Sequence, residues 1–120
     1  MQVRADGDGT IRFAVNYSFE FDMLIAVLTN GVWVPIAFDN TWKAYFVTRP
    51  DANSNTISFQ ADHESGITLN SNGVVQIRIP EEEMAVDPGE YSYDVKFVRP
   101  DGTDFGAVNK KAIGMESNIR

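Results

Sequence analysis

Alternation of apolar and polar side chains with a period of two residues is the feature that most constrains the fold of this chain. It is clearest at residues 91–97, where Tyr, Tyr, Val and Phe occupy every second position and polar side chains lie between them. Successive side chains of a β-strand point to opposite faces of its sheet, so this period predicts strands. No helical stripe exceeds one turn. The one helical turn that we expect begins at Pro80 and ends at Met84, because proline suits the first helical position and the three intervening glutamates favour the positive end of the helix dipole.

Turn signals divide the alternating runs into short strands. Asn30-Gly31 and Asn72-Gly73 are pairs that favour tight hairpin turns, and a third turn is expected at residues 100–102. Strands at spacings of about eight to twelve residues are typical of sandwiches and barrels. Tyr91 follows a turn and opens the strongest strand, where Ig-like sandwiches carry a tyrosine that bonds back to the preceding corner; an ordinary buried tyrosine is the alternative. The chain is therefore predicted to be an all-β, Ig-like antiparallel β-sandwich of about seven short strands.

One domain is expected, because 120 residues are enough to bury a single hydrophobic core without disulfide bonds or metal ions. We place this β-sandwich domain at residues 10–115. Residues 1–9 contain two Asp-Gly pairs, little apolar surface and no alternation, so they cannot offset the backbone entropy of ordering and are expected to form a flexible arm. Residues 116–120 have no pattern and are expected to fray.

Composition argues against several classes of function. There is no cysteine and His63 is the only histidine, so no thiolate site, multi-histidine metal site or cysteine nucleophile is available. Asp6-Gly7-Asp8-Gly9 is similar to the opening of a calcium loop but lacks the distal glutamate, and a flexible loop is the favoured interpretation. A net charge of −7 argues against nucleic acid and against an anionic membrane surface. We expect no enzyme activity, no cofactor, no metal and, from the absence of an apolar leader, no signal peptide.

Contact residues are predicted at two places. Trp33 and Pro35 share the strand after the Asn30-Gly31 turn, where proline favours a sheet edge and an exposed tryptophan would suit a protein contact, although a core tryptophan is the alternative. The preceding strand is apolar on both sides in its second half, so it is expected to be buried on both faces or covered by a neighbour. The second place is the N-terminal arm, which is expected to order on a partner. Its candidate contact residues are Met1, Gln2, Val3 and Arg4.

A series of turn-and-strand motifs follows in a fixed order. It consists of an Asn-Gly turn leading to Val-Pro-Ile-Ala-Phe at residues 30–38, Trp-Lys-Ala-Tyr at 42–45, Gly-Ile-Thr-Leu at 66–69, Gly-Val-Val-Gln-Ile at 73–77, Asp-Pro-Gly-Glu-Tyr-Ser-Tyr-Asp-Val at 87–95 and Arg-Pro-Asp-Gly at 99–102. This order resembles a β-sandwich module of tailed-bacteriophage structural proteins: the N-terminal domain of baseplate upper proteins and related tail, neck and capsid-surface proteins. Residues 1–13 depart from the family, and no helical stem follows Ile113.

The resemblance implies a non-enzymatic virion protein that is made in the host cytoplasm. Its partners would be other virion proteins, with which it docks in a symmetric assembly as a homo-oligomer. A carbohydrate-binding module that recognises a host surface glycan is the alternative from another class. Such a module would need exposed, coplanar aromatic side chains on a concave face with polar groups around them.

Overall fold

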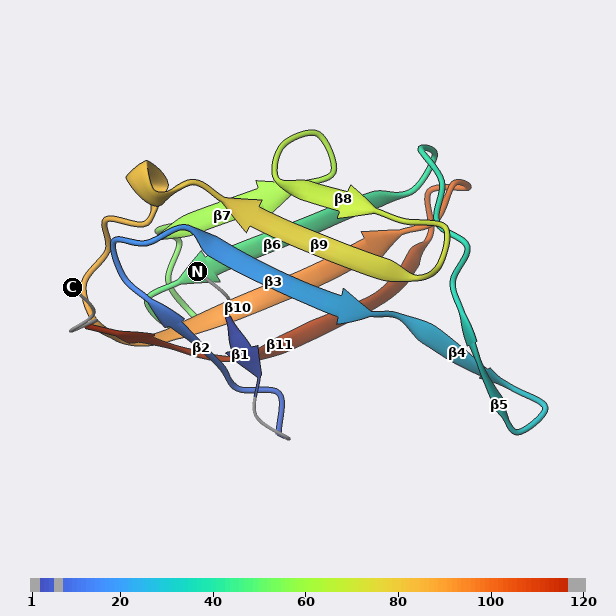
Figure 1. The fold of residues 1–120 in the computed structure, drawn as a ribbon, viewed down its shortest axis with the longest axis horizontal. Helices are drawn as coiled ribbons and strands as arrows, with labels where there is room; N and C mark the ends of the chain where they lie inside the picture. Colours follow the sequence, from blue (N-terminus) through green and yellow to red (C-terminus); the bar gives the residue numbers. More distant parts are fainter. Residues whose placement is uncertain (1–2, 6–7, 117–120) are drawn as a thin grey trace.

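The computed structural model describes residues 3–5 and 8–116, and it has the all-β fold that the alternation predicts (Figure 1). The one helical element among these residues is the 3-10 turn η1 (Glu81–Glu83), which lies within the turn predicted from Pro80 to Met84. The strands number eleven in the described part rather than about seven, since short strands also form outside the main sandwich. They are β1 (Arg4–Ala5), β2 (Ile11–Ala14), β3 (Phe19–Leu24), β4 (Ala26–Thr29), β5 (Val32–Pro35), β6 (Lys43–Arg49), β7 (Phe59–Asp62), β8 (Ile67–Leu69), β9 (Val74–Ile79), β10 (Gly89–Val98) and β11 (Asp104–Met115).

Two sheets lie face to face, and a third projects from them. The larger sheet has the strand order β1-β2-β11-β10-β6-β7, and the smaller has the order β3-β9-β8. In Figure 1 the smaller sheet lies in front of the larger one, and the separate β4–β5 hairpin extends away from both at the lower right. Pairing is antiparallel except between β2 and β11, which run parallel. The sandwich is thus antiparallel, as predicted, with one parallel exception.

The strand order is that of an Ig-like sandwich. In a constant-type Ig domain one sheet carries the order C-F-G and the other A-B-E-D. Strands β6, β10 and β11 match the first order, and β3, β9 and β8 match B, E and D. The tyrosine corner is confirmed, because the Tyr91 hydroxyl donates to the backbone carbonyl of Asp87 at 2.5 Å. No described strand occupies the position of strand A beside β3, since β1 and β2 belong to the larger sheet.

Aromatic side chains fill the space between the two sheets. The rings of Phe13 and Phe59 lie 5.1 Å apart, and the Phe19 ring lies 5.3 Å from that of Phe46. Strand β10 contributes the alternating side chains that its sequence predicts: Tyr93 is buried, with Val95 and Phe97 on the same face and polar residues between them. The Tyr93 hydroxyl donates to the carbonyl of Gly9 at 2.6 Å, which joins the penultimate strand to the turn before β2.

One polar side chain is buried in this core. Thr48, on β6, has no exposed surface and follows Ala44 and Phe46 on the inward face of the strand. Its hydroxyl has no hydrogen-bond partner in the described structure. Burying a hydroxyl without a partner costs about 1–3 kcal/mol, so Thr48 lowers the stability of the fold.

The expected domain boundary at residue 10 does not match the structure for residues 3–5. The Val3 side chain is 5% exposed, and its N–H donates to the carbonyl of Glu20 at 2.7 Å. Arg4 and Ala5 then pair with β2. Residues 3–5 are thus ordered because the Val3 side chain reaches the core and because β2 provides hydrogen-bond partners for the backbone. The polar composition of the arm reveals neither contact. Met1 and Gln2 lie outside the described residues, as do residues 6–7 and 117–120 of the predicted arm and frayed end.

Three turns share the sequence Asp-x-Thr, in which the aspartate carboxylate accepts the backbone N–H of the threonine. The distances are 3.0 Å for Asp8 and Thr10, 2.8 Å for Asp39 and Thr41, and 2.9 Å for Asp101 and Thr103. For Asp39 and Asp101 the threonine hydroxyl and then its N–H hold the pKa below the ordinary value, and for Asp8 the N–H has the larger effect. The carboxylate of Asp8 is therefore engaged in a turn.

Candidate functional site

A long uncharged segment includes the most exposed large apolar side chains among the residues that the structure describes. Residues 23–38 contain no Asp, Glu, Lys, Arg or His, although 22% of the whole chain is charged. The segment covers the end of β3, the β4–β5 hairpin and the return to the core. Exposed strand edges usually carry charges that prevent pairing with other chains. A hairpin that lacks them is suited to contact another protein.

The hairpin turn forms as its sequence predicts. Asn30 and Gly31 both have positive φ angles, of 50° and 81°, which are the conditions for a tight type I′ turn. The turn places Thr29 opposite Val32, Leu28 opposite Trp33, Val27 opposite Val34 and Ala26 opposite Pro35. The predicted Asn-Gly hairpin is thus confirmed.

Both faces of the hairpin are apolar and exposed. Because side chains alternate along a strand, Leu28 and Trp33 lie on one face, and Val27, Val32 and Val34 lie on the other. The exposed fractions are 55% for Leu28, 62% for Val32 and 67% for Trp33. Burial on both faces, the first of the two alternatives expected for this strand, is therefore wrong, and coverage by a neighbour stays a prediction. Figure 1 gives the reason: the hairpin extends past the end of the sandwich, beyond the reach of either sheet.

The root of the hairpin is fixed to the sandwich. The N–H of Ile25 donates to the carbonyl of Gly73 at 2.9 Å, and the N–H of Ile36 donates to the carbonyl of Ile25 at 3.0 Å. Gly73 has a φ of +85°, and a Cβ atom there would lie 2.8 Å from the Ile25 oxygen and 2.9 Å from Cβ of Pro35. Only glycine allows this close approach of the β8–β9 turn to the hairpin. The sandwich thus presents the hairpin from a rigid base.

Phe38 completes the attachment on the other side of the root. Its side chain is buried, with its ring 5.0 Å from that of Trp42 and 5.7 Å from that of Phe97. Trp42 packs in turn against Phe105, at 5.6 Å between ring centroids. The two tryptophans therefore differ in role: Trp42 belongs to the packed end of the sandwich, and Trp33 is exposed on the hairpin.

The structure separates the predicted contact residues. Trp33 and Pro35 lie on the same face of β5, and both are exposed. The Val3 side chain is buried, so it cannot contact a partner as expected; Arg4 lies in β1, opposite Arg12. Met1 and Gln2 lie outside the described residues. Figure 1 shows β1 beside β2 at the lower edge of the sandwich, away from the tip of the hairpin, so β1 and the hairpin do not form one surface.

The sequence interpretation missed several apolar residues of the hairpin surface. They are Leu24, Val27, Leu28, Val32 and Val34, each of which has more than a third of its surface exposed. The signal that could have found them is the absence of charge over residues 23–38. A strand that is apolar on both sides and also uncharged on its flanks is as typical of an interface as of a core.

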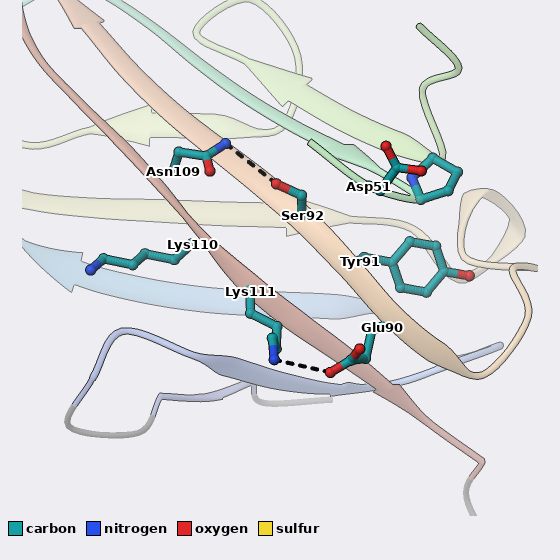
Figure 2. A pocket seen from close by; sticks show the side chains of 8 residues that line it. Asp51, Glu90, Tyr91, Ser92, Asn109, Lys110 and Lys111 are labelled. Atoms are coloured by element: carbon teal, nitrogen blue, oxygen red, sulfur yellow. Dashed lines mark hydrogen bonds and ion pairs between the residues drawn. The ribbon is translucent and has the colours of Figure 1, made fainter. Parts of the chain in front are cut away.

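An open depression of about 360 Å³ lies where β10 and β11 meet the loop after β6 (Figure 2). Four of its polar side chains form two pairs: Lys111 Nζ lies 3.0 Å from a carboxylate oxygen of Glu90, and the Asn109 amide donates to the Ser92 hydroxyl at 3.3 Å. Because these side chains satisfy each other, the depression has the character of a solvated sheet surface.

His63 is also held in place rather than free in solvent. Its Nδ1 accepts the N–H of Ala44 at 3.3 Å, and its ring lies edge-on to that of Tyr45, with centroids 5.5 Å apart. This partly buried position points to a role in fixing the β7–β8 loop. Within residues 3–5 and 8–116, no three His, Asp or Glu side chains gather as a metal site would require. The same residues include no helix long and apolar enough to cross a bilayer.

Comparison with known proteins adds no assignment to this geometry. No family model matches the sequence, and no curated protein matches it either. The similarity to phage modules therefore stays a prediction from the turn-and-strand motifs, and the hairpin is the feature from which a function is best inferred.

Proposed function

We propose that the chain is a non-enzymatic structural component of a tailed-bacteriophage virion and that it docks onto another virion protein through the β4–β5 hairpin. The virion setting rests on the order of turn-and-strand motifs. The docking role rests on one observation: an uncharged hairpin projects from the sandwich with large apolar side chains exposed on both faces. A two-stranded hairpin alone is marginally stable in water, so covering its faces would stabilise it.

The side chains of the hairpin define the chemistry of the partner. Trp33 and Leu28 lie opposite each other and form an anchor on one face, and tryptophan is among the residues that contribute most to protein interfaces. Burying a large aliphatic or aromatic side chain contributes about 1.5–3 kcal/mol. Because the opposite face carries valines, the partner is expected to enclose the ribbon in an uncharged, apolar groove.

The described part of this chain offers no such groove. Large apolar side chains that are exposed away from the hairpin and its root are Tyr45, Ile57, Val108 and Met115. Tyr45 lies on β6, Ile57 lies before β7, and the other two lie far apart along β11. These isolated side chains do not form a surface complementary to both faces of the ribbon, which favours a different protein as the partner.

A glycan partner has less support. A sugar-binding platform presents coplanar aromatic rings in a concave setting with polar groups around them. Trp33 stands on a projecting ribbon among aliphatic residues, and Trp42 is packed against Phe38 and Phe105. The geometry therefore favours a protein partner over a sugar.

Particle incorporation tests the proposal. Virions of the phage that encodes the chain, purified on a density gradient, are expected to contain it at a fixed stoichiometry by immunoblot. A Leu28→Asp/Trp33→Asp variant, complementing a deletion, is expected to remain in the soluble fraction, because two carboxylates would be desolvated in an apolar groove. Ile57→Asp, at an exposed apolar residue outside the hairpin, is the matched control and should be incorporated normally.

Two outcomes would contradict the proposal separately. If the wild-type chain is missing from purified particles, the virion role is wrong. If the double variant enters particles as efficiently as Ile57→Asp, with both variants folded by circular dichroism, the hairpin is not the docking element.

A further inference from the structure

One edge of the hairpin continues an open edge of the sandwich. In a strand paired on one side, the N–H and C=O groups of alternate residues point toward the partner and away from it. The N–H of Ile25 donates to Gly73 and its carbonyl accepts the N–H of Ile36, so both backbone groups of Ile25 point toward the paired side. The carbonyl of Glu20 points to the other side of the strand, where it accepts the N–H of Val3. By the same alternation, the backbone N–H and C=O groups of Leu24, Ala26 and Leu28 point outward. No described strand lies on that side of β3 or β4.

The opposite edge of the hairpin is less suited to pairing. Trp33 and Pro35 lie opposite Leu28 and Ala26, so the same alternation turns their backbone groups outward on β5. Pro35 has no N–H, which removes a donor from this edge, as prolines do on protected edge strands. The hairpin therefore has one edge with its donors complete, on β4, and one edge that is blocked, on β5.

We infer that β4 pairs antiparallel with β4 of a second copy of this chain, so that two hairpins join into a four-stranded sheet. The inference rests on the hairpin being an interface, as in the proposed function, but not on the virion setting. A two-fold axis at Ala26 places Ala26 opposite its own counterpart and Leu24 opposite Leu28 of the second copy. The three residues of each edge then exchange hydrogen bonds across the axis.

Charge favours a second copy at this edge. A net charge of −7 opposes self-association, but residues 23–38 are uncharged, so no like charges meet across the pair. Because the hairpin projects from the sandwich (Figure 1), the paired segments are the uncharged ones, and physiological salt screens the charges that lie farther away. The edge is thus self-complementary in hydrogen bonding and in charge.

The blocked edge limits the assembly to two copies. A two-fold interface closes on itself, and the four-stranded sheet ends on both sides at β5, where Pro35 lacks a donor. The two-fold axis is perpendicular to the sheet, so Leu28 and Trp33 of both copies lie on the same face. Pairing through the edge therefore joins two small apolar faces into one larger face, which remains available to a different protein.

Sedimentation velocity over a concentration series tests the inference on the purified chain. The wild type is expected to convert from a species of 13.4 kDa to one of twice that mass as concentration rises.

Ala26→Pro removes one outward donor from each copy and is expected to raise the dissociation constant of the dimer at least about tenfold. Ala26→Ser keeps the donor at similar size and should dimerise like the wild type. Pro35→Ala restores the missing donor on β5 and is expected to produce species larger than the dimer.

Hydrogen exchange of the wild type gives a readout that needs no variant. The amides of Leu24, Ala26 and Leu28 should become protected as the concentration rises, while the Trp33 amide on the opposite edge stays unprotected. A chain that stays monomeric throughout the series, or edge amides that exchange freely at every concentration, would overturn the inference. If the chain dimerises but is missing from virions, the inference stands and the virion role is refuted. If the chain enters virions but stays monomeric, the virion role stands and the inference is refuted.

Discussion

The hydroxyl of Tyr91 donates to the backbone carbonyl of Asp87, four residues earlier, at 2.5 Å. This bond ties the start of β10 to the corner that follows η1, and the Tyr91 ring packs 5.8 Å from that of Phe13. Removing only the hydroxyl, in Tyr91→Phe, is expected to lower the free energy of unfolding by about 1 kcal/mol, since the ring stays packed. Urea unfolding measures this change. Tyr45→Phe, on the exposed face of β6, is the matched control, and an equal loss in both variants would show that the corner bond contributes nothing.

High pH is expected to destabilise the domain through Tyr91 and Tyr93. Burial, and then the nearby charges of Asp87 and Asp8 respectively, raise the pKa of each phenol above its ordinary value. The folded state therefore holds protons that the unfolded state has released. The contribution to stability is complete below about pH 10, where the unfolded phenols are still protonated, and is lost as the pH rises through the raised values.

Absorbance titration of the phenolates checks this expectation. In the folded chain, Tyr91 and Tyr93 should ionise at a higher pH than they do in the unfolded chain. Tyr93→Phe should make the free energy of unfolding less steeply dependent on pH above about pH 10. If the phenolate titration is the same in the folded chain, the Tyr93→Phe variant and the unfolded chain, the environment assigned to these two side chains is wrong.

Thr48→Val is expected to stabilise the domain by about 1 kcal/mol. The hydroxyl of Thr48 is buried without a partner, and valine has nearly the same shape without the desolvation cost. Thermal and urea unfolding measure the effect. Thr68→Val, at an exposed position on β8, should change stability little. A loss of stability in Thr48→Val would indicate that the hydroxyl has a partner in solution, such as a bound water.

Gly73→Ala is expected to detach the root of the hairpin. The added Cβ would meet the Ile25 oxygen and Pro35 at a φ of +85°, so strain and collision together should cost about 3 kcal/mol. Gly102→Ala has a similar φ of +89° but open space around it, so it isolates the backbone strain at about 1–2 kcal/mol. The amides of Ile25 and Ile36 should exchange faster in Gly73→Ala only. Equal effects in both variants would mean that the contact at the root adds nothing.

Local patterns predicted the strands well because side chains two residues apart lie on the same face of a strand, so neighbouring positions in the sequence already show which face is apolar. The alternation in β10 and the positive φ angles of Asn30 and Gly31 are both found as expected. The burial of Val3 and the parallel pairing of β2 with β11 are long-range outcomes that no local period contains. For residues 24–28 the sequence left two alternatives open, because apolar side chains on both faces of a strand are equally consistent with a core and with an interface. Only the position of the hairpin beyond the sandwich excludes the core.

The position of β11 between β2 and β10 has a consequence for how the chain folds during synthesis. Until residues 104–115 emerge from the ribosome, β1 and β2 have no strand that joins them to the larger sheet, and β10 has an open edge. Contacts between distant parts of the sequence form slowly, and exposed strand edges and apolar surface in the waiting chain favour aggregation. Nascent chains of this protein should therefore depend on chaperone protection until the eleventh strand closes the sheet.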